Sequence, residues 1–363
     1  MERIITATVR STSLGSVLVT GGAGFIGCSL SQRLASLAGR YVVVDNLHPQ
    51  VHPSGERPSS LHVAAELVVG DVVDASTWDK VFKDFSPDVV IHLAAETGTG
   101  QSLTESSRHG LVNVVGTTQL LDGMTRHGRT PEHVLLSSSR AVYGEGAWLT
   151  ASGQTVYPGQ RTHAQLRRSQ WDVEGATSQA SSASSTRPDP TSVYGATKLA
   201  QENILAAWCR AVTVPLTVLR LQNVYGPGQS LTNSYTGIVA LFSQLAAKRQ
   251  VIPVYEDGRV TRDFVYIEDI ASAFLAAVCG PRQPLLVADI GCGRSTSLME
   301  LAGQLASHHG APAPVVNGLF RDGDVRHASC TLSAARDHLG WQPAWDLGAG
   351  LAALQEWLPQ APA

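Results

Sequence analysis

The sequence predicts an α/β protein, with a doubly wound parallel sheet over residues 14–221 and a smaller α/β region over residues 222–363. Three observations predict this fold. Residues 17–45 run as a β-branched segment, a glycine-rich turn, a helical pattern and a second apolar run. Strand-like and helix-like segments alternate after them, which is typical of a parallel sheet covered by helices. The apolar runs are also continuous, as expected of strands buried on both faces.

The first turn contains three glycines with distinct expected roles. Gly21 allows a sharp turn off the strand, Gly24 allows close approach to a pyrophosphate, and Gly27 allows the helix to pack closely on the sheet. The N–H groups around Phe25 and Ile26 begin the helical pattern and would face the phosphates, with the positive end of the helix dipole behind them. The turn therefore predicts a dinucleotide site.

The second apolar run ends in Asp45, which is followed by Asn46. A carboxylate at this position can accept hydrogen bonds from an adenosine ribose, whereas a 2′-phosphate would meet an anion. No arginine follows Asp45 directly, so we expect NAD rather than NADP, with Asn46 beside it. A glycine-rich turn without a ligand is the alternative. The strand before the turn, the helix after it and the acid beyond it argue against that alternative.

Composition excludes several classes of partner. The 363 residues include 27 basic and 30 acidic ones, a balance that gives no reason to expect nucleic acid or a membrane surface. The cysteines show no metal-ligand or redox spacing, so we expect buried thiols in a reducing cytoplasm and no metal site. Residues 1–13 lack the apolar run of a secretory signal, and no apolar stretch reaches membrane-spanning length.

The third and fourth strands are expected over residues 66–71 and 88–95. Asp71 lies at the carboxyl end of its strand, where ligands bind in open α/β sheets, so we expect Asp71 and Val72 near the adenine. A helix N-cap is an equally open reading of Asp71. His92 is expected to be a core histidine rather than a catalyst.

Two further strand ends are candidates for the site. Leu93, Ala94 and Ala95 end the fourth strand, and the two alanines are small where the backbone would pass a cofactor. The strand expected over residues 133–139 ends in hydroxyls, Ser137 to Ser139. Such serines can hydrogen-bond a substrate hydroxyl, although more often they only terminate a strand.

Residues 109–127 have the pattern of one helix, but residues 145–191 break the alternation. The latter are rich in Ser, Thr, Gln, Gly and Pro and lack helical or alternating periodicity. Because a structureless loop of this length is unusual inside a domain, we expect a surface insertion there. Its composition leaves two alternatives, a lid over the site or a partly disordered excursion.

Helical periodicity resumes at Tyr194, and Lys198 follows on the same helix face. An ordinary exposed pair is the alternative to a functional one. Chemistry favours function, because a phenol becomes a usable base when an ammonium and a nicotinamide cation stabilise its phenolate.

After a sixth strand over residues 215–221 the chain keeps a set of polar anchors. Guanidinium groups bind phosphate oxygens bidentately, so two arginines in this region predict a binding site for a second anion besides the dinucleotide. A surface salt bridge is the alternative role for either arginine. The anchors are Asn223, Asn233, Arg262, Arg321 and Asp324.

These motifs, in this order, resemble the extended short-chain dehydrogenase/reductases, and specifically the nucleotide-sugar epimerase and dehydratase group, which has a Rossmann fold. The stretches 92–102, 138–146 and 223–231 are similar to the dTDP-L-rhamnose 4-epimerase type. The resemblance implies a cytoplasmic homodimer with bound NAD and a dTDP- or UDP-hexose substrate.

The resemblance also implies roles for residues. Tyr194 would be the base, Lys198 would bind the nicotinamide ribose and lower the pKa of the tyrosine, and Ser139 would donate to the sugar oxygen. Asn223, Arg262 and Arg321 would hold the diphosphate, with Asp324 near the nucleoside ribose. Further contacts are implied for the cofactor from Asn46, Asp71, Val72, Leu93, Ala94, Ala95 and Ser137, and for the substrate from Thr97, Asn223, Asn233 and Asp324.

The implied reaction is transient oxidation at C4 of the hexose. The 4,6-dehydratases place an Asp-Glu pair directly after the hydroxyl residue, whereas this chain has Arg140 and Ala141, so dehydration is disfavoured. A 4-ketoreductase acting on a dTDP-4-keto-6-deoxy sugar with NADH or NADPH is the closest alternative. A non-catalytic dinucleotide sensor is a further alternative, against which the intact Ser139, Tyr194 and Lys198 set argues.

Overall fold

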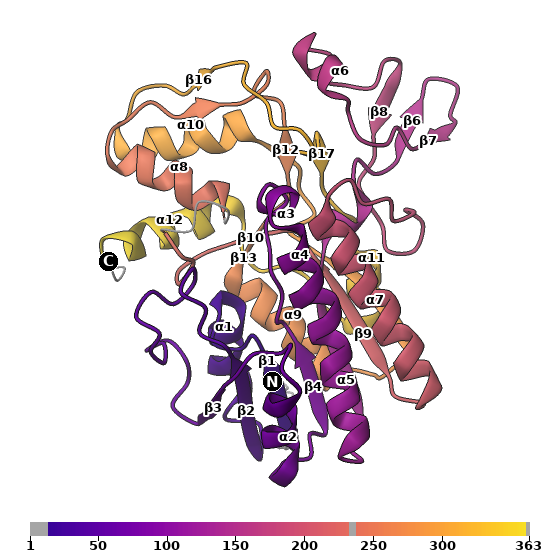
Figure 1. Ribbon diagram of the computed structural model, residues 1–363. Coiled ribbons are helices and arrows are strands. Elements are labelled where there is room, and N and C mark those ends of the chain that lie inside the picture. Colours follow the sequence, from indigo (N-terminus) through magenta and orange to yellow (C-terminus); the bar gives the residue numbers. More distant parts are fainter. Residues whose placement is uncertain (1–13, 232–236, 361–363) are drawn as a thin grey trace, which may run out of the picture.

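The computed structural model describes residues 14–231 and 237–360 and is built on a seven-stranded sheet (Figure 1). Every pairing within this sheet is parallel. In spatial order the strands are β14 (Leu285–Ile290), β9 (Leu216–Leu221), β5 (His133–Ser139), β4 (Val89–His92), β1 (Ser16–Thr20), β2 (Arg40–Asp45) and β3 (Ala65–Val69). The predicted doubly wound sheet is therefore confirmed.

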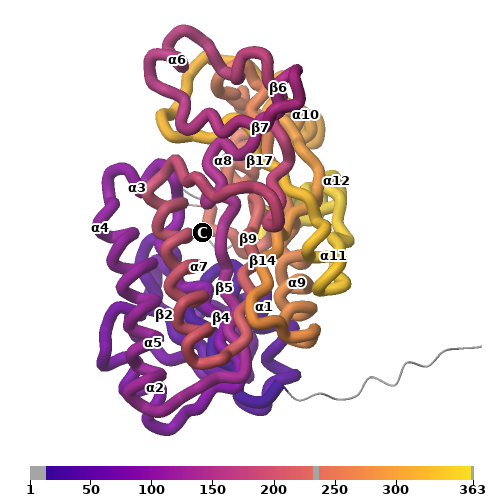
Figure 2. The backbone as a smooth tube through the Cα atoms, turned by 90° about the vertical axis from the view of Figure 1, so that its right-hand side faces the viewer, coloured from indigo at the N-terminus to yellow at the C-terminus, as the bar shows by residue number. Residues whose placement is uncertain are grey.

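Helices cover both faces of the sheet, as Figure 2 shows from the side. One face packs α1 (Phe25–Leu34), α9 (Ile267–Cys279) and α11 (Ser333–Leu339) over one apolar cluster. The other packs α2 (Ala75–Asp84), α5 (Gly116–Arg126) and α7 (Val193–Ala211) over a second. The strands are continuous apolar runs because both of their faces are removed from water.

The predicted helix over residues 109–127 is three consecutive pieces. α4 (Ser106–His109) passes into a π-helical turn, η1 (Gly110–Val115), before α5 begins, and a short α3 (Gln101–Thr104) precedes them. The wider turn holds the buried Asn113, whose amide donates to Thr197 Oγ1 in α7 at 2.9 Å and to the carbonyl of Glu96 at 3.0 Å. The π-turn thus ties α7 to the end of β4, beside the expected site.

After β9 the chain forms a second layer around its own apolar cluster. The cluster packs helices α8 (Ile238–Ala247), α10 (Leu298–His309) and α12 (Leu347–Trp357), and η3 (Leu358–Gln360) follows. Short strands complete the layer: β10 (Asn223–Tyr225) with β13 (Phe264–Tyr266), β11 (Pro253–Val254) with β16 (Val315–Val316), and β12 (Thr261–Arg262) between β15 (Thr296–Ser297) and β17 (His327–Ala328).

Two segments from beyond residue 221 return to the large sheet. β14 pairs in parallel with β9 along its whole length, and α9 packs beside α1. Leu286, Ala288 and Ile290 are buried in the same cluster as the first strands, which explains the pairing. In the described ranges no helix is both long and apolar enough to cross a membrane.

The insertion, residues 145–191, contains regular structure, although its sequence shows no helical or alternating periodicity. It contains a small antiparallel sheet and one short helix, and in Figure 1 it lies beside β12 and β17. The helix begins with a capping box in which Thr162 and Gln165 satisfy each other's backbone N–H groups. This local signal is not visible in the overall composition of the segment. Its elements are β6 (Trp148–Thr150), β7 (Thr155–Val156), α6 (His163–Arg167) and β8 (Ala176–Ser178).

Candidate active site

The glycine-rich turn after β1 has the geometry that the sequence predicts. Gly21 has a φ of +65°, and a Cβ there would lie 2.7 Å from the backbone of Ala94. A Cβ on Gly27 would lie 2.4 Å from the Cα of Gly22, so only glycine allows α1 to approach the turn this closely. Gly24 is the N-cap of α1 and supplies no side-chain cap.

The start of α1 is consequently open to an anion. The backbone N–H groups of Phe25 and Ile26 belong to the first helical turn, where no intrahelical acceptor exists. The N–H of Ala23 instead donates to Oδ2 of Asp45 at 3.0 Å. A pyrophosphate accepts from such first-turn N–H groups, so this turn fits the dinucleotide that it predicts.

The acidic residues expected at the adenosine end lie together at the carboxyl ends of β2 and β3. Asp45 accepts from the N–H of Leu47 at 2.9 Å through its other oxygen. The amide of Asn46 donates to Oδ2 of Asp71 at 2.9 Å, and Asp71 Oδ1 accepts from Val73 N at 3.1 Å. The cap of α2 is Asp74, so Asp71 is not a helix N-cap.

The remaining predicted cofactor residues surround the same carboxyl edge. Val72 is buried and packs against Gly116, while Leu93 and Ala94 leave β4 directly above Gly21. Ala95 follows Ala94 and is half-buried, and Ser137 is buried near the end of β5. The topology thus brings residues from β2, β3, β4 and β5 to one edge.

Ser139 and Tyr194 meet at this edge. Ser139 ends β5, where its hydroxyl caps the short η2 (Arg140–Tyr143) by accepting from Ala141 N at 3.2 Å. Burial raises the pKa of Tyr194, while a hydrogen bond with Ser139 and the charge of Arg140 oppose that rise. His109 of α4 presents its ring to Tyr194 edge-on, 6.4 Å between centroids. The predicted hydroxyl and phenol are therefore in contact.

Lys198 lies one turn further along α7 and is buried. Burial lowers its pKa to about 7, with the carboxylate of Glu202 acting in the opposite direction. Its ammonium donates to Oε1 of Gln201, whose own amide reaches Thr117 Oγ1 at 2.9 Å and the His92 ring at 3.1 Å. Lys198 is thus held by a buried network that the sequence did not reveal.

His92 belongs to this network. It contacts Thr20 Oγ1 at 2.7 Å through Nδ1 and Thr117 Oγ1 at 2.9 Å through Nε2. Burial and the charge of Lys198 lower the pKa of His92 to about 3, so the ring is neutral. The prediction of a core histidine is confirmed. Gln201 and Thr117 are the residues that sequence reasoning missed, because an amide and a hydroxyl carry no motif.

A second buried network supports the strand that carries Ser139. Ser138 donates to Glu202, which pairs with Arg220 of β9 at 2.6 Å. Arg220 also donates to the hydroxyl of Tyr143 at 2.9 Å, and that hydroxyl donates to Asp289 of β14 at 2.8 Å. These contacts fix α7 relative to β5 and β9, which positions Tyr194 against Ser139.

The anchors expected to hold the diphosphate lie on the second layer. Arg262 is buried in β12, where its Nη2 contacts Oδ1 of Asp324 at 2.7 Å. Arg321 lies over the ring of Tyr255, 5.3 Å from the guanidinium carbon to the ring centroid. Asn223 begins β10 and accepts from Arg140 Nε at 2.8 Å.

Two predicted substrate residues need separate mention. Thr97 is exposed after β4, and its carbonyl faces Nε2 of His109 at 3.4 Å. Asn233 lies outside the described residues.

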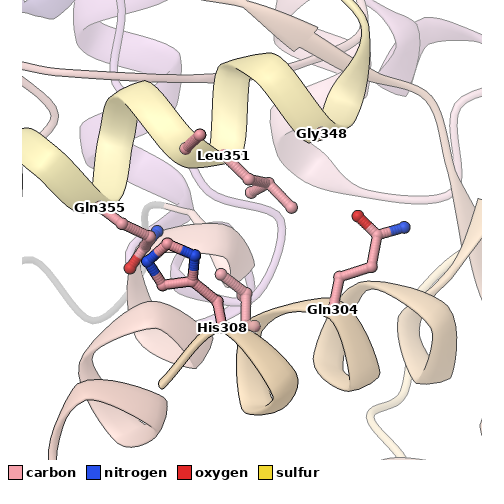
Figure 3. Close-up of a pocket in the computed structure, with 7 residues that line it drawn as sticks. Gln304, His308, Gly348, Leu351 and Gln355 are labelled. Carbon is pink, nitrogen blue, oxygen red and sulfur yellow. The ribbon is translucent and has the colours of Figure 1, made fainter. Parts of the chain in front are cut away.

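A small hollow between α10 and α12 is unrelated to this edge (Figure 3). Leu305, Leu351 and Gln355 line it, and Gln355 is already bound to Ser243 Oγ at 3.0 Å and to His309 Nε2 at 2.8 Å. These contacts are those of helix packing, so the candidate site remains at the carboxyl edge of the sheet.

A model of the NAD dependent epimerase/dehydratase family matches residues 17–285. The chain belongs to this family. The predicted family is therefore confirmed, and with it the prediction of an enzyme whose cofactor is NAD.

Curated relatives within the family are similar along their whole length. The dTDP-L-rhamnose 4-epimerase of Burkholderia thailandensis is 62% identical over 344 residues, which are 95% of either chain. The UDP-glucose 4-epimerase of Mycolicibacterium smegmatis is 32% identical over 341 residues, covering 92% of this chain and 96% of that one.

Solved structures of the family agree with the fold. The UDP-glucose 4-epimerase of Thermotoga maritima, crystallised with UDP-glucose, superposes with a TM-score of 0.77 at 28% identity, covering 95% of this chain and 99% of that chain. The UDP-glucose 4-epimerase of Thermus thermophilus, in complex with NAD, gives a TM-score of 0.76 at 26% identity, covering 96% and 100%.

Proposed function

We propose that this enzyme is a nucleotide-sugar 4-epimerase that inverts C4 of a dTDP-linked 6-deoxyhexose. One observation carries the proposal: Ser139, Tyr194 and Lys198 lie at one sheet edge beside the dinucleotide turn, in a chain 62% identical to a dTDP-L-rhamnose 4-epimerase. NAD, held at the glycine-rich turn after β1, would supply an acceptor for the C4 hydride and a hydride donor for the opposite face. Oxidation and reduction then cancel, so the cofactor is needed but not consumed.

The chain's own residues handle the proton. Tyr194 as phenolate accepts the proton of the C4 hydroxyl, and Ser139 keeps that hydroxyl aligned with the phenol. In the second half of the reaction the phenol returns the proton to the oxygen of the 4-keto sugar. The positive charges of Lys198 and Arg140 favour the phenolate that the first half needs.

The second layer would hold the nucleotide while the sugar turns. Arg262, Arg321, Asn223 and Asp324 lie on residues 222–363, whereas the reacting groups lie on residues 14–221. Binding at the diphosphate leaves the hexose free to present both faces of C4. This division of labour supports the two-domain organisation that the sequence predicts. A cytoplasmic homodimer stays a prediction.

Turnover without added cofactor tests the proposal. The purified enzyme is incubated with dTDP-L-rhamnose and, separately, with UDP-glucose, and C4 inversion is followed by NMR. We expect inversion of the dTDP sugar with no added nucleotide and release of NAD on denaturation. Stoichiometric consumption of NADH with a 4-keto substrate would instead establish a ketoreductase. Failure of both reactions, with NAD bound, would leave a dinucleotide sensor.

A further inference from the structure

Arg140 follows Ser139 directly and stands where the dehydratases carry a carboxyl group. It begins η2, and its Nε donates to Oδ1 of Asn223 at 2.8 Å, a contact that joins the first region to the second. The backbone of Arg140 is therefore held at the start of η2, and its guanidinium is held by the Asn223 amide. The reaction outlined above assigns it no contact with substrate.

The rest of this guanidinium is not engaged by the protein. Within residues 14–231 and 237–360, Nε is the one group of Arg140 that has a hydrogen-bond partner, and no carboxylate pairs with it. The two acids that act on it electrostatically are occupied: Asp324 pairs with Arg262, and Glu145 pairs with Arg161 at 3.0 Å. Four N–H donors of Arg140 remain for a ligand.

The groups that act electrostatically on Arg140 come from both regions of the chain, so Arg140 lies between the reacting residues and the expected diphosphate anchors. Tyr194 and Arg262 both act on it electrostatically, together with Asp324 and Glu145. Burial and the like charge of Arg262 lower its pKa to about 9, so the protein holds this cation at a cost that its own contacts do not offset. Such an uncompensated group is typical of a binding site.

The position along the substrate follows from this placement. In the proposed function, chemistry occurs at Ser139 and Tyr194, and the diphosphate would lie toward Arg262 and Arg321. The part of a nucleotide sugar between these points is the pyranose ring with its remaining hydroxyl groups. A half-buried guanidinium donates well to such vicinal oxygens, because its N–H groups form a planar fork.

We propose that Arg140 binds the hexose, with its Nη groups donating to ring hydroxyl oxygens between the reacting C4 and the diphosphate. The inference rests on the proposed function. Arg140 also keeps a cation where a carboxylate would otherwise remove a proton from carbon beside the 4-keto group.

Binding of dTDP and of a dTDP-hexose separates this contact from a diphosphate contact. In Arg140→Gln, calorimetry should show the Kd of dTDP-L-rhamnose raised about 10- to 100-fold, the loss expected for a hydrogen bond from a charged donor. The Kd of dTDP, which lacks the hexose, should change less than about twofold, and NAD should be retained. Arg140→Lys should recover part of the affinity. Arg187→Gln, at an exposed arginine of the insertion, is the control and should match wild type.

Two results would overturn the assignment. Equal losses for dTDP and dTDP-L-rhamnose would place Arg140 on the diphosphate, and equal affinities in variant and wild type would show no ligand contact. Retained NAD and dTDP binding show that Arg140→Gln is folded. Wild-type enzyme that binds dTDP-L-rhamnose without inverting it would refute the proposed function. The comparison of Kd values between Arg140→Gln and wild type would still show whether Arg140 contacts the hexose.

Discussion

Arg161 fastens the insertion to the second layer, and replacing it by methionine tests that attachment. Its guanidinium donates to Glu145 at 3.0 Å, to Glu256 at 2.9 Å and to the carbonyl of Asp324 at 2.8 Å. The side chains of Arg161 and Glu256 are 8% and 3% exposed, so both charges have left water. Methionine keeps the length of the side chain but leaves the carboxylates without this cation.

The expected cost follows from what the carboxylates retain. Removing one partner of a buried ion pair costs about 3–5 kcal/mol. Arg326 remains in contact with both acids, through Nη1 to Glu256 at 2.9 Å and through its backbone N–H to Glu145 at 3.0 Å. We therefore expect the lower end, about 3 kcal/mol, for opening of the insertion. At about 1.4 kcal/mol for each factor of ten, this free energy makes the fraction of molecules with a detached insertion roughly 100-fold larger.

Limited proteolysis and kinetics measure the two consequences. Cleavage within residues 145–191 should accelerate by about two orders of magnitude, because it samples the open population. The KM for the nucleotide sugar should rise more than kcat falls, since Arg161 holds the backbone of Asp324, the partner of Arg262. Arg168→Met, at an exposed arginine of the same insertion, is the control. Cleavage rates and KM within twofold of wild type would refute the attachment.

Three further changes give distinct readouts. Tyr194→Phe should lower kcat by about 10²–10⁴-fold or more, the range for loss of a general base, while NAD stays bound; a near-normal rate would remove Tyr194 from the chemistry. Arg262→Ala should raise the Kd of the nucleotide sugar about 10- to 100-fold with NAD unaffected, and an unchanged Kd measured by calorimetry contradicts its role. Burial raises the pKa of Asp289 to about 6, so between about pH 4 and 6 the folded protein keeps a proton that the unfolded chain has lost. The stability of wild type relative to Asp289→Asn should then fall by about 3 kcal/mol as pH rises from 4 to 7 in urea titrations, whereas a constant difference would show that the carboxyl titrates normally.

The parts predicted correctly depend on local rules. Glycine spacing, the continuous strands and the Tyr194 and Lys198 spacing each follow from backbone freedom or helical period. The helix and strands of the insertion were not predicted, because they are short and because ion pairs with residues far away in sequence hold them in place. Arg326, for example, pairs with Asp172 across 154 positions of sequence. No local pattern reports such a contact.

The sequence by itself determined the sheet and the glycine-rich turn and predicted Tyr194 as the base, because each of these signals lies within a few consecutive residues. The tertiary structure alone decided how those groups are held. It joined Lys198 to Gln201 and His92, set Arg140 against Asn223 across 83 positions, and returned β14 to the first sheet. These outcomes depend on which surfaces exclude water together, and burial of that kind is settled only when the whole chain has packed.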